Sequence, residues 1–267
     1  MTRSSRTTKF VNWLVAGITV LGLSASLVAR GAPVAAQPPG LVVSVAVSLH
    51  AALAEIAGLY RAATGVSVSL NTGGSNTLAR QIVAGARAAV FVSADEVQMD
   101  VVETAGRVVA GTRTPLVTNE LAVVAPNDRP APAGLAELLQ GGVARLAMGE
   151  TASVPAGVYG RRWLEHEGAW ARLQTKVIPF PTVRAVLAAV EAGRVDAGIV
   201  YATDAREAAV RVVGRVSARE HAYLNIVQPA AVIAGPNEAD GRRFLQFLQG
   251  PAARAVFERR GFRTIER

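Results

Sequence analysis

The stretch LVVSVAVSLHAALAEIAGLYRAATG, residues 41–65, contains the structural unit that repeats along this chain. Its first seven residues are mostly apolar and rich in valine, which predicts a buried strand. From Ser48 onward, apolar residues recur at helical spacing as far as Gly65, a residue type common just after a helix. A strand followed directly by a helix is the unit from which parallel sheets covered by helices are built.

Two further units of this kind follow. VSVSLN (66–71) predicts a strand and SNTLARQIVAGA (75–86) a helix, and AAVFVSAD (88–95) and EVQMDVVETAG (96–106) repeat the pair. This rhythm indicates a parallel sheet with helices on both faces.

The pattern changes near Thr118 and then resumes. Predicted strands and helices alternate through NELAVVAPN, LAELLQGG, RLAMGE and PAGVYGRRWLEHEG, then a helix–strand–helix unit over 182–210, a strand within 223–235 and two helices within 238–262. The units fall into two similar halves. We therefore predict an α/β fold of two lobes, each a mixed, mostly parallel sheet flanked by helices, with a ligand cleft between them. Residues 41–119 plus 228–267 form lobe I and residues 120–227 form lobe II.

The first 36 residues differ in composition from the rest. Arg3, Arg6 and Lys9 precede an apolar run over about 11–28, and small residues follow as far as Ala36. A basic start, an apolar middle and a small-residue end are typical of a secretory signal peptide, which we expect to be cut after Ala36. An uncleaved membrane anchor is the alternative, although polar residues interrupt the apolar run. We expect export to the periplasm.

Cysteine and charge exclude several classes of function. The chain has no cysteine, hence no disulfide, no thiol nucleophile and no lipid-anchored cysteine. Removing the four cations of the leader from 28 basic residues leaves 24 against 20 acidic ones, and Lys176 is the one lysine among them. The arginines are scattered and aromatic residues make up 5% of the chain, so nucleic acid is not an expected partner.

Five predicted strand–helix turns share one chemical character. They contain Ser48, Ser75, Ala156, Val183 and Tyr201, and no cation occupies their first two positions. In parallel α/β sheets, helix N-termini lie at the edge where ligands bind, and their unpaired N–H groups attract anions. Two lobes facing each other would bring together backbone N–H groups, two serine hydroxyls and a phenol. This set suits a fully deprotonated dianion. The alternatives are that the serines cap helices and that Tyr201 is a core residue.

The same segments resemble the molybdate-binding proteins of bacterial ABC-type molybdate importers over about residues 41–262. The resemblance is carried by TLARQIVAGA, VFVSAD, VPAGVYG, VRAVLAAVEAG, GIVYATDA and GPAARAVFERRGF, in this order. It implies the two-lobed type II periplasmic binding-protein fold, which closes on tetrahedral molybdate or tungstate.

By position, the resemblance assigns ligand contacts to five residues. The side chains of Ser48 and Ser75, the backbone N–H groups of Ala156 and Val183, and the Tyr201 hydroxyl would contact the oxygens of the anion, with no direct metal ligand. The chain departs from the family at Val47 and at Gly73, Gly74 and Asn76, where the family often has serines.

The function implied is capture of molybdate or tungstate and delivery to the inner-membrane permease of an ABC importer. We expect a monomer with no cofactor and no catalytic residue. A carrier of another tetrahedral oxyanion such as sulfate is the close alternative. An enzyme is disfavoured because the chain lacks a phosphate loop, a G-x-S-x-G elbow and an H-E-x-x-H pair. The sensing half of a transcription regulator would need a DNA-reading helix-turn-helix and no export signal.

Several charged residues stand near these turns. We place Asp204 outside the contact shell, because a carboxylate there would repel a dianion. Arg80 and Arg184 follow the starts of ligand-binding helices and would either add positive potential or pair with acids across the cleft. The three histidines, His50, His166 and His221, are too dispersed in the sequence to suggest a metal site.

Overall fold

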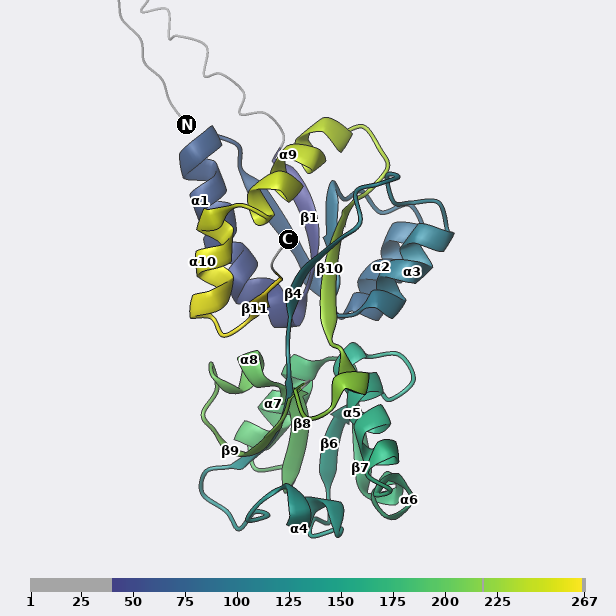
Figure 1. Ribbon diagram of the computed structural model, residues 1–267, viewed down its shortest axis with the longest axis vertical. Helices are drawn as coiled ribbons and strands as arrows, with labels where there is room; N and C mark the ends of the chain where they lie inside the picture. Colours follow the sequence, from purple (N-terminus) through teal and green to yellow (C-terminus); the bar gives the residue numbers. More distant parts are fainter. Residues whose placement is uncertain (1–39, 218, 266–267) are drawn as a thin grey trace, which may run out of the picture. The chain divides into compact units, whose positions relative to one another are not determined.

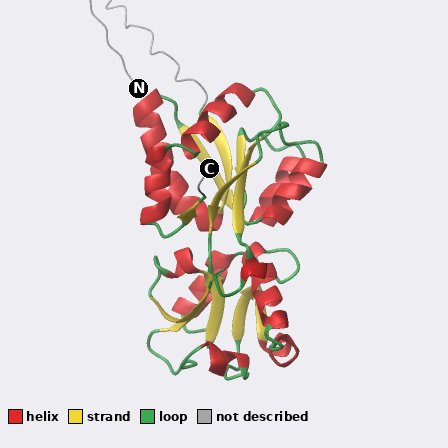
Figure 2. Cartoon of the chain, in the orientation of Figure 1, coloured by secondary structure: helices red, strands yellow, loops and turns green. Residues whose placement is uncertain are grey.

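Two mixed sheets flanked by helices make up residues 40–217 and 219–265, the part of the chain that the computed structural model describes (Figure 1, Figure 2). The predicted signal peptide, residues 1–36, lies outside the described residues. Within these residues, no helix combines the length and the apolar character needed to cross a membrane.

Lobe I contains a six-stranded sheet in the order β11-β4-β10-β3-β1-β2, in which β2, β1 and β3 are parallel and the remaining neighbours are antiparallel. Its elements are β1 (Leu41–Ala46), η1 (Val47–Leu49), α1 (His50–Thr64), β2 (Val68–Gly73), α2 (Ser75–Val83), β3 (Val90–Val92), α3 (Glu96–Thr104), β4 (Thr114–Thr118), β10 (Val227–Val232), α9 (Glu238–Leu248), α10 (Pro251–Arg259) and β11 (Arg263–Thr264).

Lobe II contains a five-stranded sheet in the order β7-β6-β8-β5-β9, with β7, β6 and β8 parallel and β5 antiparallel to both of its neighbours. Its elements are β5 (Leu121–Pro126), α4 (Leu135–Leu139), β6 (Leu146–Gly149), α5 (Pro155–His166), α6 (Trp170–Leu173), η2 (Gln174–Lys176), β7 (Val177–Phe180), α7 (Val183–Glu191), β8 (Ala197–Tyr201), α8 (Ala202–Ala205), β9 (Val210–Val216) and η3 (Ala222–Leu224).

The chain passes between the lobes twice, from β4 to β5 and from β9 through η3 to β10 (Figure 1). Of the two predicted lobe boundaries, 119/120 lies in the first crossing and 227/228 lies one residue into β10. Each crossing leads into a strand that begins at the interlobe edge, so β5 runs against β8 and β10 runs against β3.

Burial of the central strands follows from their composition. Every residue of β3, β5 and β8 is buried, and these strands consist mainly of valine, alanine, isoleucine and phenylalanine. Strands covered by helices on both faces carry such continuous apolar runs rather than alternating ones. The helices contribute one apolar side each, as in α7, where Val183, Val186, Leu187 and Val190 are buried.

The prediction of a two-lobed α/β fold with mixed sheets is confirmed, but three details differ from the prediction. Antiparallel pairings outnumber parallel ones among the described strands, because the strands at the crossings run against the parallel ones. The helix expected to continue through residues 201–210 ends at Ala205, and the chain then forms β9 at the edge of the lobe II sheet. Strand β4 was also missed, since it lies in a stretch where the helical and strand periods are both weak.

Gly157 provides a test of the packing that fixes the start of α5. A Cβ atom on Gly157 would collide with the backbone carbonyl of Gly149 at the end of β6. Alanine normally stabilises a helix interior by about 0.5–1 kcal/mol over glycine. We expect Gly157→Ala instead to lower the free energy of unfolding by about 1–3 kcal/mol, measured by urea denaturation, because the obstacle is backbone.

Gly58→Ala is the matched control. Gly58 lies inside α1, and apart from the neighbouring helix backbone no atom of the described residues lies within 4 Å of the added Cβ. This variant should therefore gain the ordinary helix stabilisation. Equal stabilisation by both substitutions would show that the close approach of α5 to β6 is not a constraint.

Candidate functional site

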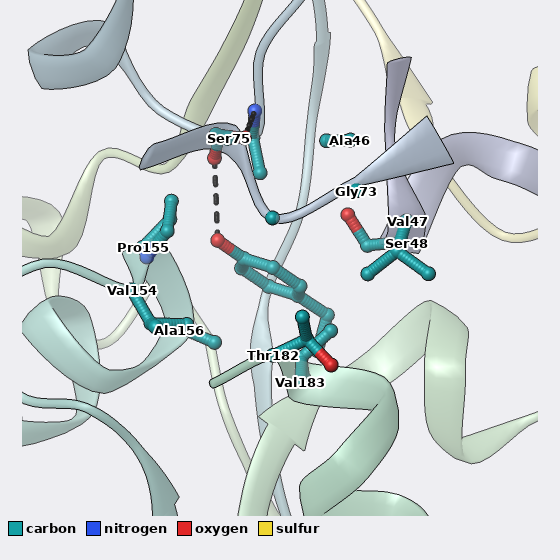
Figure 3. Close-up of a pocket in the computed structure, with 13 residues that line it drawn as sticks. Ala46, Val47, Ser48, Gly73, Ser75, Val154, Pro155, Ala156, Thr182 and Val183 are labelled. Carbon is teal, nitrogen blue, oxygen red and sulfur yellow. Dashed lines mark hydrogen bonds between the residues drawn. The ribbon is translucent and has the colours of Figure 1, made fainter. Parts of the chain in front are cut away.

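A small pocket lies between the two lobes, at the interlobe edge of both sheets (Figure 3). It is formed by the ends of strands and the beginnings of helices from both lobes. Its lining residues are Ala46, Val47, Ser48, Gly73, Gly74, Ser75, Ala94, Val154, Pro155, Ala156, Thr182, Val183 and Tyr201. All five residues predicted to contact a ligand therefore lie around one cavity.

Each of these five residues owes its place to a strand–helix junction. Ser48 lies in η1 directly after β1, and Ser75 is the first residue of α2. Ala156 is the second residue of α5, Val183 is the first of α7, and Tyr201 is the last residue of β8. Because the parallel strands of each sheet end at the interlobe edge, their following helices begin there as well.

Ser48 presents a hydroxyl that no group of the described protein satisfies. The residue is 8% exposed, and its Oγ has no hydrogen-bond partner among the described residues. The predicted capping role for Ser48 is wrong, because α1 begins at His50 with Leu49 as its N-cap and no side-chain cap bond. A buried hydroxyl without a partner is unfavourable, so a ligand that accepts its proton would stabilise this arrangement.

Ser75 is held in a donor orientation. Its Oγ accepts a 2.9 Å hydrogen bond from the backbone N–H of Ala94, and its side chain makes no cap bond to α2. Because the oxygen already accepts a bond, the hydroxyl proton remains available for an acceptor in the pocket. The alternative of Ser75 as a simple helix cap is therefore wrong.

Tyr201, in lobe II, forms a hydrogen bond to Ala94 in lobe I, the residue that also contacts Ser75. Its hydroxyl donates a 3.2 Å hydrogen bond to the carbonyl oxygen of Ala94 and is completely buried. Burial raises the pKa of Tyr201 well above its ordinary value, so the phenol keeps its proton. A phenol has one proton, and contact with an anion through it would require release of the Ala94 carbonyl. The Tyr201–ligand contact stays a prediction.

Backbone N–H groups of α5 and α7 supply donors from lobe II. Ala156 and Val183 lie in the first turns of their helices, where N–H groups have no intrahelical partner. The Thr182 hydroxyl caps α7 by accepting from the N–H of Ala185 at 3.1 Å. This cap satisfies a later donor and leaves that of Val183 for another acceptor.

The pocket is small and carries no formal charge. Its volume is about 20 Å³, against roughly 10–15 Å³ for a single buried water. None of the thirteen lining residues is ionisable except the neutral Tyr201. Such a cavity suits one compact solute that accepts hydrogen bonds.

Two buried acids lie just outside this lining. Burial raises the pKa of Asp204, in α8, to about 7, against the attraction of the Arg184 guanidinium, and neither carboxylate oxygen makes a hydrogen bond to the described protein. Burial also raises the pKa of Asp95 to about 6, although the N–H of Gln98 and the Ser93 hydroxyl donate to it. Asp204 does not line the pocket, in agreement with its predicted place outside the contact shell.

The two arginines near the predicted site do not reach the lining. Arg184 lies 3.8 Å from Asp204 and 3.7 Å from Glu207, acids of its own lobe rather than across the cleft. Arg80 donates to the Thr77 hydroxyl within α2. Neither residue is among those that form the cavity.

Several residues that complete the site have no recognisable signal in the amino-acid sequence. Ala94 acts through its backbone alone and Thr182 through a helix cap, whereas Asn76 and Gly74 occur only as departures from a family pattern. Two histidines are also closer than predicted. His166 and His221 each place Nδ1 within 3.5 Å of Glu167, because the segment that contains η3 packs against the end of α5. Even so, no group of three potential metal ligands occurs among the residues described.

Comparison with known proteins places these features in one context. The family model of the bacterial extracellular solute-binding protein matches residues 41–263. The molybdate-binding protein ModA of Escherichia coli (strain K12) is 38% identical over 230 residues, which span 83% of this chain and 88% of the relative. ModA of Mycobacterium bovis is 31% identical over 259 residues, covering 93% and 97% of the two chains. The structure of the Azotobacter vinelandii periplasmic molybdate-binding protein matches with a TM-score of 0.74 and 25% identity, over 85% of this chain and all of the other.

The buried carboxyl of Asp204 predicts a pH-dependent stability. Its pKa rises on folding from about 4 to about 7, so the fold favours the protonated form. This contribution is fully present below about pH 4 and is lost as the pH rises through about 7. We expect Asp204→Asn to be more stable than the wild type at pH 8, with the difference shrinking toward pH 4.

Thermal unfolding of both proteins between pH 4 and pH 8 measures this effect. Asp95 titrates in both, so the difference between the two curves isolates Asp204. Parallel curves across that range would contradict a protonated Asp204 in the folded protein.

Proposed function

This chain belongs to the family of bacterial extracellular solute-binding proteins, and on that premise we propose that it captures molybdate or tungstate and delivers it to an inner-membrane ABC importer. The single observation that carries the proposal is the pocket of uncharged hydrogen-bond donors, in which Ser48 and Ser75 face the N-termini of α5 and α7. The names of the relatives, which are molybdate-binding proteins, supply the identity of the anion.

The donors suit an anion that carries no proton. The polar side chains of the lining are the hydroxyls of Ser48, Ser75, Thr182 and Tyr201, with no carboxylate among them. A fully deprotonated tetrahedral dianion accepts hydrogen bonds on every side. Hydrogen phosphate also needs an acceptor for its own proton, and the lining offers no charged one.

Neutral donors also permit release. Hydrogen bonds to a charged group contribute about 1.5–3 kcal/mol each, and they depend steeply on geometry. When the lobes separate, the donors of lobe I and lobe II no longer point at one centre, and the anion loses about half of its bonds. A lysine or arginine clamp would retain a long-range attraction even in an opened cleft.

The place of action is outside the inner membrane, where the permease of the importer meets its binding protein. The predicted signal peptide over residues 1–36 supports this location. The similarity to the periplasmic molybdate-binding protein of Azotobacter vinelandii supports it as well. The protein acts as a monomeric carrier without a cofactor, does not bind nucleic acid and catalyses no reaction. The absence of cysteine and the small uncharged cavity support a binding role over catalysis.

Titration calorimetry with molybdate, tungstate, sulfate and phosphate tests this function on the mature chain. We expect binding of molybdate and tungstate, weaker binding of sulfate, whose tetrahedron is smaller, and weaker binding of phosphate, because its proton lacks an acceptor. Phosphate that binds as tightly as molybdate, or molybdate that does not bind, would reject the proposal.

Ser48→Ala should weaken molybdate binding by about 10- to 100-fold, since one hydrogen bond to a charged group is lost. The same variant should leave the unfolding free energy of the ligand-free protein almost unchanged, because Oγ makes no hydrogen bond within the part of the chain that the structure describes. Ser44→Ala is the control, since Ser44 is a buried serine of β1 that accepts from Asn71 and does not line the pocket. Equal affinities of Ser48→Ala and Ser44→Ala for molybdate would remove Ser48 from the binding shell.

A further inference from the structure

We propose that Asn76 and Ser153 form an interlobe latch that holds the pocket closed and positions its two sets of donors. The Asn76 Nδ2 group donates a 3.0 Å hydrogen bond to the Ser153 hydroxyl, from α2 in lobe I to the turn before α5 in lobe II. As a positioning role toward the bound anion, the latch rests on the proposed function.

Asn76 is suited to this role because its side-chain amide has both an acceptor, Oδ1, and a donor, Nδ2. Its Oδ1 accepts a 2.9 Å hydrogen bond from the N–H of Thr77, which fixes the side chain against the start of α2. The amide nitrogen then points to the other lobe. The residue is 8% exposed, so the bond it makes is largely shielded from water.

Ser153 receives contacts from two helices of lobe I. Its hydroxyl accepts the hydrogen bond from Asn76 of α2, and its carbonyl oxygen accepts a 3.5 Å hydrogen bond from the Gln98 side chain of α3. Ser153 precedes Ala156 by three residues, and its own N–H donates to Glu150 in the turn after β6. A displacement of Ser153 would therefore also displace the N-terminus of α5.

Gly74 leaves the room that the latch needs. A Cβ atom at Gly74 would lie 2.8 Å from Asn76 Oδ1, too close for normal contact, and 3.4 Å from the carbonyl oxygen of Pro181 in lobe II. A larger residue would displace either the Asn76 amide or the turn before α7. The Gly-Ser-Asn order thus packs the lobes closely at the point where Ser75 faces the cavity.

The consequence is a coupling between closure and donor geometry. Asn76 adjoins Ser75, and Ser153 lies just before the Ala156 N–H, so the latch joins the two helix ends that supply these donors. Opening the lobes requires its rupture. Both partners are uncharged, so the latch adds no repulsion toward a dianion.

Spin labels on two introduced cysteines can report lobe closure without labelling at other sites, because the natural sequence contains no cysteine. Val101 in α3 and Val212 in β9 are each 42% exposed, and spin labels at Val101→Cys and Val212→Cys report the distance between the lobes by electron paramagnetic resonance. In this background, Asn76→Ala and Ser153→Ala should each shift the distance distribution toward separated lobes, without ligand or with added molybdate.

Stopped-flow dissociation of molybdate gives the second readout. Each single variant should release the anion about 3- to 10-fold faster, as expected for one neutral hydrogen bond, and the double variant no faster than either single variant. Asn71→Ala is the matched control. It removes amide bonds to Ser44 and Gln81 within lobe I and should change neither the distance nor the release rate.

The latch would be overturned if the wild type, both single variants and the control had the same distance distribution, with and without molybdate. So would additive effects of the two substitutions on the release rate. A wild type that fails to bind molybdate contradicts the proposed function alone, since the distances in the ligand-free protein still decide whether Asn76 and Ser153 hold the lobes together.

Discussion

The binding site depends on hydrogen-bond donors that both lobes direct toward one small cavity. Helices that follow parallel strands begin at the interlobe edge, and their first N–H groups have no partner within the helix. Ser48 Oγ has no hydrogen-bond partner among the described residues, and Ser75 accepts from Ala94 and keeps its proton for another acceptor. Burying a donor without a partner costs free energy, so a compact acceptor that binds all of these donors at once would stabilise the site.

Closure completes this set, because each lobe supplies only part of it. The bond from Tyr201 to the Ala94 carbonyl and the bond from Asn76 to Ser153 join the lobes on two sides of the cavity. Both are neutral hydrogen bonds, which contribute about 0.5–1.5 kcal/mol each. Bonds of this size favour a closed state without locking it, as a carrier that must release its ligand requires.

The strand–helix rhythm made the two-lobed fold predictable, because buried strands and amphipathic helices have distinct periods. The five site positions followed from that rhythm together with family motifs, and the structure places them around one cavity. The missed features lack a local signal. Ala94 contributes only backbone, and the Asn76–Ser153 bond joins residues 77 positions apart. His166 and His221 approach the same residue, Glu167, only after the segment with η3 packs against α5. Ser48 resembled a helix cap because a short 3₁₀ turn before α1 is invisible in the sequence.

The central claim is that an uncharged pocket holds a dianion, and anomalous X-ray scattering from molybdenum in crystals grown with molybdate tests it most directly. We predict a single strong peak between the N-termini of α2, α5 and α7, with the oxygens within hydrogen-bond distance of Ser48, Ser75 and the N–H groups of Ala156 and Val183. A peak coordinated by guanidinium groups, or located away from this cavity, would contradict the account.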